Sequence, residues 1–444
     1  MNAYDPVLYS RLLTSLTLGF HIIFATIGVG IPILIALAEW MGIIRKDPHY
    51  TLLARRWARG FTITVAVGVV TGTAIGFQLS LLWPSFMRVA GQAIALPLFM
   101  ETFAFFFEAI FLGIYLYTWD RFSKPVYHLL LLVPVMIGSS ASAMFITMVN
   151  GFMNSPQGFT LGPNGVLTDI DPIAAMFNPA APTKIAHVLA SAYAASAFVL
   201  AAIAAYSLLK GRTHVYHKKA LRLTVIAGFV FSIATAVVGD LSGKYLAEYR
   251  PDKLAAAEWH FETESGAPLV IGGVLQEDGS VKYGLTIPYA LSILAHGTPN
   301  STVTGLHEFP PDERPPLVSH YLFDLMVLGG IYMTFIGFVY VLAIRLRSWN
   351  PHHPLLLRMI LWGGPIAMLS IELGWIFSEV GRQPWILFGY MKTAEGATTS
   401  GQVDTMLVVF TLLYIVLAFT CMKVLQGLFR KNTPEQELAA KGLL

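Results

Sequence analysis

Long apolar stretches alternate with shorter polar segments along the whole chain. Hydrocarbon about 30 Å thick is crossed by a helix of about 20 mostly apolar residues. Nine stretches reach that length, at 14–40, 61–86, 95–118, 127–150, 185–209, 223–246, 319–344, 359–380 and 404–427. The first is too long, and lacks the basic start, for a cleavable signal peptide, so we expect it to remain as a helix. The pattern predicts an all-α, polytopic membrane protein with about nine transmembrane helices.

The basic residues are unevenly distributed over the connections between these stretches. Of the 29 Lys and Arg residues, 19 lie on alternate connections and on the C-terminal tail. The opposite connections include 151–184, whose only basic residue is Lys184, and the acidic segment 247–318. Because Lys and Arg are enriched in cytoplasmic loops, the N-terminus is expected outside the cell and the C-terminus in the cytoplasm.

This arrangement divides the chain into four regions. Residues 1–246 hold six transmembrane helices and 247–318 form an outer loop, after which 319–427 hold three more helices and 428–444 form a cytoplasmic tail. The outer loop is long for a connection, and loops of that length are usually functional or disordered.

The composition narrows the class of protein. Apolar residues make up 55% of the 444 residues, charged residues only 12%, and the mean hydropathy is +0.62. Soluble proteins use about a quarter of their residues as charged ones, so a soluble enzyme, a disordered regulator and a nucleic-acid binder are excluded. The single cysteine, Cys421, excludes an intrachain disulfide, a Cys-rich metal site and covalent haem attachment. Any haem would therefore be held without covalent bonds.

Histidines inside the apolar stretches are candidates for a functional site, because ionisable residues are unfavourable in a bilayer. His21 lies in the first stretch, close to Gly19. It fits either a hydrogen bond to a carbonyl of the next helix or an axial bond to haem iron. His187 opens the fifth stretch, and Met326 lies at similar depth in the seventh. A methionine there is usually packing, but with His187 it could complete a six-coordinate haem.

Two pairs of carboxylates share a spacing of seven residues. Glu101 and Glu108 lie in the third stretch, and Glu372 and Glu379 in the eighth. Seven residues bring two side chains to one face of a helix. Such pairs indicate a proton path or a cation site, although a hydrogen bond between helices is the simpler alternative.

Aromatic and basic residues accompany the second pair. Trp375 lies between the two carboxylates on the same face, and Arg382 follows in the motif 381–385 at the predicted outer rim. An arginine there could bind a carboxylate or a haem propionate through two parallel hydrogen bonds.

One short segment of the outer loop, 251–259, has helix-forming composition. Its Lys253 and Glu258 lie five residues apart. Taken by itself, this segment predicts a solvated helix on the protein surface.

Together these segments resemble the large subunit, subunit I, of the cytochrome bd-type ubiquinol or menaquinol oxidases. The resemblance covers nearly the whole chain and rests on 18–21, 100–108, 119–121, 150–153, 253–256 with Glu258, 374–375 and 381–385. The last block is the most specific.

The resemblance implies an enzyme of the bacterial cell membrane that reduces dioxygen to water with electrons from membrane quinol. It implies three non-covalent haems, namely a low-spin b, a high-spin b and a d. His187 and Met326 would bind the low-spin haem b iron. His21 and Glu379 would bind the two high-spin haems, with Glu101 beside or opposite one iron. Which of the two binds haem d is left open.

The resemblance also implies roles for the remaining candidates. Glu108 would deliver protons, with Ser142 as a weaker candidate. Lys253 and Glu258 match quinol-oxidising residues of the outer loop, which the family calls the Q loop. Trp375 and Arg382 would couple the haems electronically and electrostatically.

The family's reaction joins two sides of the membrane. Quinol would be oxidised at the outer face and protons taken from the cytoplasm, so that proton motive force arises without pumping. The partners implied are a second membrane subunit and a small single-helix subunit. Whether the donor is ubiquinol or menaquinol is left open.

The chain departs from parts of the family in two places. Its outer loop is of the short Q-loop type. Asp324, two residues before Met326, stands where some relatives have an arginine, which affects the expected electrostatics of the low-spin haem and not its ligands.

The alternative is a haem-free secondary transporter that uses the intramembrane carboxylates. Such transporters usually have repeated halves with broken helices at matching positions, and this pattern is missing from the sequence.

Overall fold

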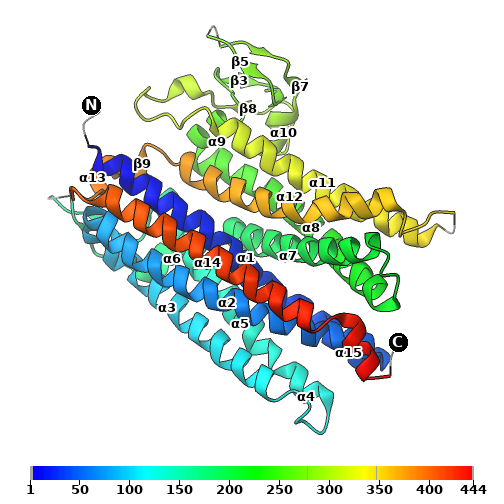
Figure 1. Cartoon of the computed structure of the whole chain (residues 1–444). Helices are drawn as coiled ribbons and strands as arrows, with labels where there is room; N and C mark the ends of the chain where they lie inside the picture. The colour runs from blue at the N-terminus through cyan, green and yellow to red at the C-terminus, as the bar shows by residue number, and fades with distance from the viewer. Residues whose placement is uncertain (1–3, 164, 278, 347, 443–444) are drawn as a thin grey trace.

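The computed structural model describes residues 4–163, 165–277, 279–346 and 348–442. Within these ranges, nine helical segments are long and apolar enough to cross a membrane, as predicted. They are α1 (Pro6–Arg45), α2 (Pro48–Leu82), α3 (Pro84–Tyr117), α4 (Pro125–Leu130) with α5 (Leu132–Asn154), α7 (Ala181–Leu209), α8 (Val215–Tyr249), α11 (Ser319–Arg345), α12 (Pro354–Val380) and α14 (Val403–Lys431). Figure 1 shows them packed side by side in one bundle.

The helices run beyond the apolar stretches that predicted them. The second stretch was expected at 61–86, whereas α2 begins at Pro48 and ends at Leu82. Its first turn is capped by Asp47, whose side chain accepts a hydrogen bond from the His49 N–H, and the next helix begins at Pro84. Apolar composition marks the part of a helix in the membrane, while caps and prolines set where the helix begins and ends.

The segment between α8 and α11 forms a compact layer over one end of the bundle (Figure 1). It contains two short helices, a 3₁₀ turn and three antiparallel strand pairs, β3–β8, β4–β7 and β5–β6. Its elements are α9 (Pro251–Ala257), β3 (Glu264–Ser265), β4 (Leu269–Ile271), β5 (Val274–Leu275), β6 (Val281–Lys282), β7 (Leu285–Ile287), α10 (Ala290–His296), β8 (Thr302–Val303) and η1 (Leu306–Glu308). We call residues 250–318 the outer segment.

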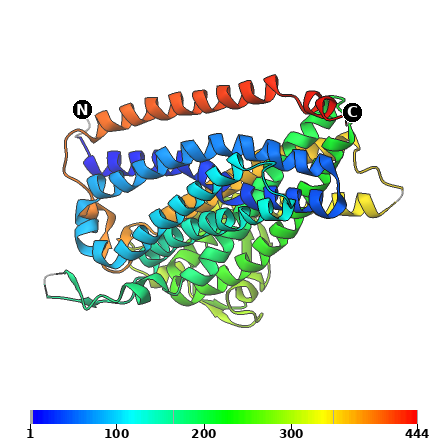
Figure 2. The ribbon, with the colours of Figure 1, turned by 90° about the horizontal axis from the view of Figure 1, so that it is seen from below.

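Smaller elements complete the two ends of the bundle. They are β1 (Thr160–Leu161), β2 (Leu167–Thr168), α6 (Pro172–Met176), β9 (Trp385–Leu387), β10 (Met391–Lys392), α13 (Thr393–Gly396) and α15 (Pro434–Ala440). Figure 2 shows the N-terminus at one end and α15 at the other, with α14 along the edge of the bundle. Helix α15 is fastened there because Glu437 pairs with both Arg56 and Arg59 of α2.

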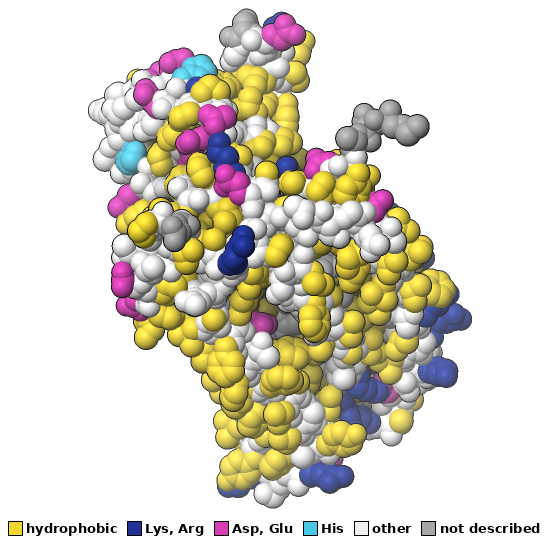
Figure 3. Space-filling model, turned by 90° about the vertical axis from the view of Figure 1, so that its left-hand side faces the viewer, with side chains coloured by type: hydrophobic (Ala, Val, Ile, Leu, Met, Phe, Trp, Pro, Cys, Tyr) yellow, Lys and Arg dark blue, Asp and Glu magenta, His cyan; other side chains and the backbone are white. Residues whose placement is uncertain are grey.

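The surface separates the two kinds of charge. In Figure 3, acidic side chains are most frequent over the end that carries the outer segment, basic ones gather at the opposite end, and a broad apolar belt lies between them. The uneven distribution of basic residues over alternate connections in the sequence thus becomes a separation of charge between the two ends of the molecule.

Candidate functional site

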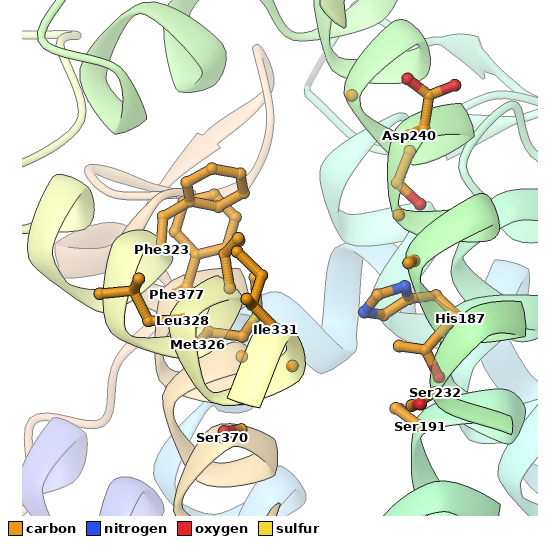
Figure 4. Close-up of a pocket in the computed structure, with 18 of the residues that line it drawn as sticks. His187, Ser191, Ser232, Asp240, Phe323, Met326, Leu328, Ile331, Ser370 and Phe377 are labelled. Carbon is orange, nitrogen blue, oxygen red and sulfur yellow. The ribbon is translucent and has the colours of Figure 1, made fainter. Parts of the chain in front are cut away.

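A cavity of about 850 Å³ lies between α7, α8, α11 and α12, and the outer segment contributes its roof. Figure 4 shows the ring of His187, from α7, directed into it, with Met326 of α11 on the opposite side. Apolar side chains such as Phe323 and Ile331 line much of the wall around Met326. The two residues that matched in depth along the sequence thus share one cavity.

A glycine makes room for Met326, and a second glycine faces His187. A Cβ added to Gly374 of α12 would lie 2.9 Å from the sulfur of Met326, closer than such atoms approach. A Cβ added to Gly239 of α8 would lie 3.6 Å from Cε1 of His187. The Nδ1 atom of His187 is buried and has no hydrogen-bond partner among the described residues.

The roof carries Lys253 and Glu258, which line the same cavity. Their segment was expected to be a solvated surface helix, and that prediction was wrong. Lys253 is 3% exposed and Glu258 is 1% exposed, because α9 lies between the bundle and the rest of the outer segment. The composition of a seven-residue helix does not reveal what covers it.

Burial shifts the pKa of each of these groups away from its ordinary value. The pKa of Glu258 is raised to about 8, first by burial and then by the nearby Asp324 carboxylate. Neither of its carboxylate oxygens has a hydrogen-bond partner among the described residues. The pKa of Lys253 lies well below its usual range, because the amine is buried and the cations of Lys184 and Arg250 are near. Its Nζ donates to the Ser378 carbonyl at 3.0 Å.

Asp324 connects the outer segment to α11. Its Oδ2 atom accepts a hydrogen bond from the Gly272 N–H and lies 3.3 Å from Nε2 of His320. The other ring nitrogen of His320 lies 2.8 Å from the Ala257 carbonyl, at the end of α9. This acidic residue, unexpected beside Met326, therefore holds the roof in place.

Glu379 lies in a cluster of charged and polar groups at the end of α12 that is next to the outer segment. One carboxylate oxygen accepts from the Asn150 side-chain amide at 2.6 Å, and the other pairs with Arg382. The Nζ atom of Lys184 donates a hydrogen bond to the side-chain carbonyl oxygen of the same Asn150. Arg382 also donates to the Trp385 carbonyl. The predicted contact between this arginine and a carboxylate is thus present.

His21 lies between α1 and α2. Its Nδ1 atom is 2.9 Å from the Thr71 hydroxyl oxygen, and that hydroxyl is 2.9 Å from the Val67 carbonyl, to which it donates. Because the Thr71 hydroxyl hydrogen already points to that carbonyl, the Thr71 oxygen can only accept from His21. Nδ1 therefore carries the ring proton and donates a hydrogen bond to Thr71. This leaves the lone pair on Nε2, the form in which a histidine binds a metal.

The two predicted carboxylate pairs reach different surroundings. Glu101 accepts a hydrogen bond from Ser142 at 2.9 Å, whereas Glu108 is buried against the Gly138 backbone. Glu372 faces α1, with Oε2 3.5 Å from where a Cβ on Gly19 would lie. Trp375, one turn further along α12, lines the main cavity.

Comparison with known proteins identifies the family of the chain. Residues 9–433 match the sequence profile described as cytochrome bd terminal oxidase subunit I. The chain belongs to the cytochrome bd terminal oxidase subunit I family. As a bd-type subunit I it is part of a terminal quinol oxidase, an oxidoreductase with haem cofactors, and a multi-pass protein of the bacterial plasma membrane. The haem-free transporter is thereby set aside.

Individual relatives cover nearly the full length. A Bacillus subtilis (strain 168) protein, provisionally named a cytochrome bd menaquinol oxidase subunit I, is 41% identical over 98% of this chain and 99% of its own. The cytochrome bd ubiquinol oxidase subunit 1 of the same strain is 30% identical, covering 93% of this chain and 91% of its own. A chain from the structure of the bd oxidase of Geobacillus thermodenitrificans is 67% identical, with a TM-score of 0.93 over 97% of this chain and 100% of that chain.

The main cavity suits a haem of a bd oxidase. It has the His187 imidazole on one wall and the Met326 thioether on the other, with apolar side chains between them (Figure 4). An imidazole and a thioether on opposite sides of a flat ring form a six-coordinate haem site. His21 offers a lone pair in the same way, and the Arg382 guanidinium suits an anionic propionate.

Several residues of this subunit I escaped sequence reasoning. Asn150 was noted only as part of a motif, and Lys184 only as the one basic residue of its connection. Its place as the single basic residue of that connection was the feature that could have drawn attention to Lys184. In the structure it belongs to the cluster around Glu379 and also lines the main cavity.

A second polar cluster near the opposite end of the bundle was missed entirely. Tyr115 donates to Glu39 at 2.6 Å, and Nδ1 of His128 lies 2.7 Å from the same carboxylate. Nε2 of His128 lies 2.9 Å from the Tyr115 carbonyl, to which it can only donate. Glu39 near the end of the first apolar stretch was the signal, and its buried partners come from helices far apart in sequence.

Proposed function

We propose that this subunit oxidises membrane quinol at the roof of the main cavity and passes the electrons through haem to dioxygen. One observation carries the proposal, namely that Lys253 and Glu258 line the same cavity as His187 and Met326. A quinol head group at the roof would lie next to the group held by the histidine and the methionine.

The roof residues would manage the protons of quinol oxidation. Quinol gives up two electrons and two protons when it becomes quinone. Glu258 is a suitable base, since a catalytic base works best with a pKa near the working pH, and its pKa is about 8. Lys253, held by the Ser378 carbonyl, would orient the quinol oxygen.

His187 and Met326 would hold the low-spin haem b. His21 and Glu379 would hold the two high-spin haems, with Glu101 beside or opposite one iron and the place of haem d left open. When bound, the haems supply one-electron transfer and the reduction of dioxygen. Trp375, between the main cavity and Glu379 on α12, would provide the electronic connection.

Protons for water formation would enter from the cytoplasmic side. Each dioxygen takes up four electrons and four protons to form two waters. Glu108 would pass protons towards Glu101, whose Ser142 partner helps to orient the carboxylate. Because quinol protons leave outside, the reaction would generate proton motive force without pumping. This requires the N-terminus outside and the C-terminus in the cytoplasm.

The proposal includes partners. A second membrane subunit and a small single-helix subunit would complete the oxidase, as the family resemblance implies. The donor would be ubiquinol or menaquinol, and the two Bacillus subtilis relatives are named for different ones.

Replacing Lys253 separates quinol oxidation from the rest of the reaction. In the purified oxidase, Lys253→Leu should raise the apparent quinol KM about tenfold or more, because a polar contact to the substrate is lost. Oxygen consumption with an artificial donor that reduces the haems directly should stay largely unchanged. Lys282→Leu, on exposed β6 of the same segment, is the matched control. Equal loss with both donors would contradict the proposed quinol role.

A further inference from the structure

A second cavity, of about 480 Å³, lies at the opposite end of the helices from the outer segment. It is formed where the end of α1 and the start of α2 meet the start of α8, the end of α11 and the connection after α11. Four cationic side chains line it, namely Arg45, Lys218, Lys219 and Arg222. None of the residues assigned to haem, quinol or proton transfer contributes to this cavity, which we call the basic cavity.

Most of this positive charge is uncompensated. Lys219 pairs with Asp47. Arg45, Lys218 and Arg222 have neither an ion pair nor a side-chain hydrogen bond to any part of the chain that the structure describes. Like charges four residues apart on a helix repel each other, and Lys218 and Arg222 have that spacing. An anion between them would relieve the repulsion.

The remaining wall of the basic cavity is apolar and aromatic. Tyr50 and Tyr340 are buried beside the cations, while Val215, Leu346 and Trp349 are exposed at the rim. Aromatic residues of this kind gather where a membrane meets water. Basic residues at one end of the helices are expected of any membrane protein with cytoplasmic positive charge, so they do not by themselves indicate a ligand. Here the cations surround one cavity that also has an apolar side. This arrangement matches a ligand that is anionic at one end and apolar at the other.

We propose that the basic cavity binds the phosphodiester head group of an anionic membrane phospholipid. The phosphate would lie among Arg45, Lys218 and Arg222. The acyl chains would leave past Val215 and Leu346 into the apolar belt. Basic pockets between transmembrane helices at the cytoplasmic side are suited to such head groups. Inorganic phosphate shares the anionic chemistry but lacks the apolar part.

Native mass spectrometry of the purified, intact oxidase tests the proposal. The complex is stripped of loosely held lipid and titrated separately with phosphatidylglycerol, phosphatidylcholine and inorganic phosphate. We expect binding of phosphatidylglycerol at least about tenfold tighter than phosphatidylcholine, weakening as salt is added because screening shortens the reach of the cations. Equal binding of both lipids, or inorganic phosphate displacing phosphatidylglycerol at equal concentration, would overturn the lipid assignment.

A charge-matched pair of variants locates the binding. Lys218→Gln with Arg222→Gln should abolish the preference for phosphatidylglycerol. Arg430→Gln with Lys431→Gln removes the same charge from the end of α14, outside the cavity, and should leave the preference intact. An unchanged haem spectrum in both would show that the proteins are folded.

A single change keeps the test decisive if the double variant does not fold. Arg45→Gln removes one cation from the last turn of α1 and should weaken phosphatidylglycerol binding several-fold. Wild-type affinity in either folded variant of the cavity would overturn the proposal.

Discussion

Glu258 illustrates how strongly position changes the chemistry of one side chain. Its carboxyl is buried in the roof with a pKa of about 8, against 4.5 for the ordinary group. Between these two values the folded protein holds a proton that the unfolded chain releases. Stability contributed by the neutral carboxyl is therefore greatest at low pH and is lost as the pH rises towards about 8.

This linkage gives a measurable pH dependence. Between pH 5.5 and 8.5 the melting temperature of the oxidase should fall more steeply in the wild type than in Glu258→Gln, whose side chain does not titrate. The difference is at most about 1.4 kcal/mol of unfolding free energy for each pH unit. Glu262→Gln, an exposed acid nearby, should behave as the wild type does. Parallel curves for all three proteins would contradict a buried neutral Glu258.

Met326 gives a prediction at the same scale. Met326→Leu keeps the volume but removes the sulfur, so a low-spin haem bound as proposed should become high-spin almost completely. Electron paramagnetic resonance and optical spectra of the purified oxidase measure the change. Met333→Leu, another α11 methionine that lines the cavity, is the control and should stay low-spin. A low-spin signal that survives Met326→Leu would remove this residue from the ligands.

At the scale of elements, α11 and α12 approach each other closely beside the main cavity, which Ser370 lines. A Cβ on Gly329 of α11 would lie 1.9 Å from Oγ of Ser370 on α12, and 3.2 Å from its Cβ. The two helices therefore meet through a glycine and a serine. Met326 lies on the first of these helices and Glu379 on the second.

Adding one methyl group at Gly329 should crowd this contact, so that the Ser370 hydroxyl or the two helices have to shift. Gly329→Ala is expected to lower the free energy of unfolding by about 1–3 kcal/mol and to reduce low-spin haem content. Ser370→Ala in the same protein removes the clashing oxygen and should restore much of both. Gly113→Ala, at a glycine with open space around it, should be nearly neutral. Failure of the second substitution to rescue the first would show that the contact does not set the spacing.

The sequence predicts elements and some of the site for identifiable reasons. The length of apolar stretches gives the number of spanning helices, and similar depth brings His187 and Met326 to one cavity. Spacing does not show what a side chain meets, so the Asn150 contact of Glu379 and the burial of α9 come only from tertiary packing. Helix ends also escaped, since they follow from caps rather than hydropathy.

For the whole molecule, the separation of charge between its two ends predicts how it sits in the membrane. The outer segment is acidic and the opposite end is basic (Figure 3). If quinol is oxidised under the outer segment, that orientation decides on which side its protons are released.

Cysteine labelling tests the orientation. Cys421 is the single cysteine, so Cys421→Ser provides a background without thiols. Lys282→Cys in the outer segment should react with a membrane-impermeant maleimide in intact cells, whereas Asn350→Cys in the connection before α12 should react only after the cells are opened. Both positions are exposed. The reverse pattern would place the acidic end in the cytoplasm.

The bond between Asp324 and the outer segment has a further consequence. This carboxylate accepts a hydrogen bond from the Gly272 N–H. Its neighbour His320, six residues before Met326, is hydrogen-bonded to the Ala257 carbonyl at the end of α9. The roof and the helix of Met326 are therefore joined by hydrogen bonds, and we expect them to move together. If quinol binds at the roof and Met326 binds a haem iron, as proposed, a quinone ring that displaced the roof would also move the thioether. The reduction potential of that iron would then report whether the quinol site is occupied.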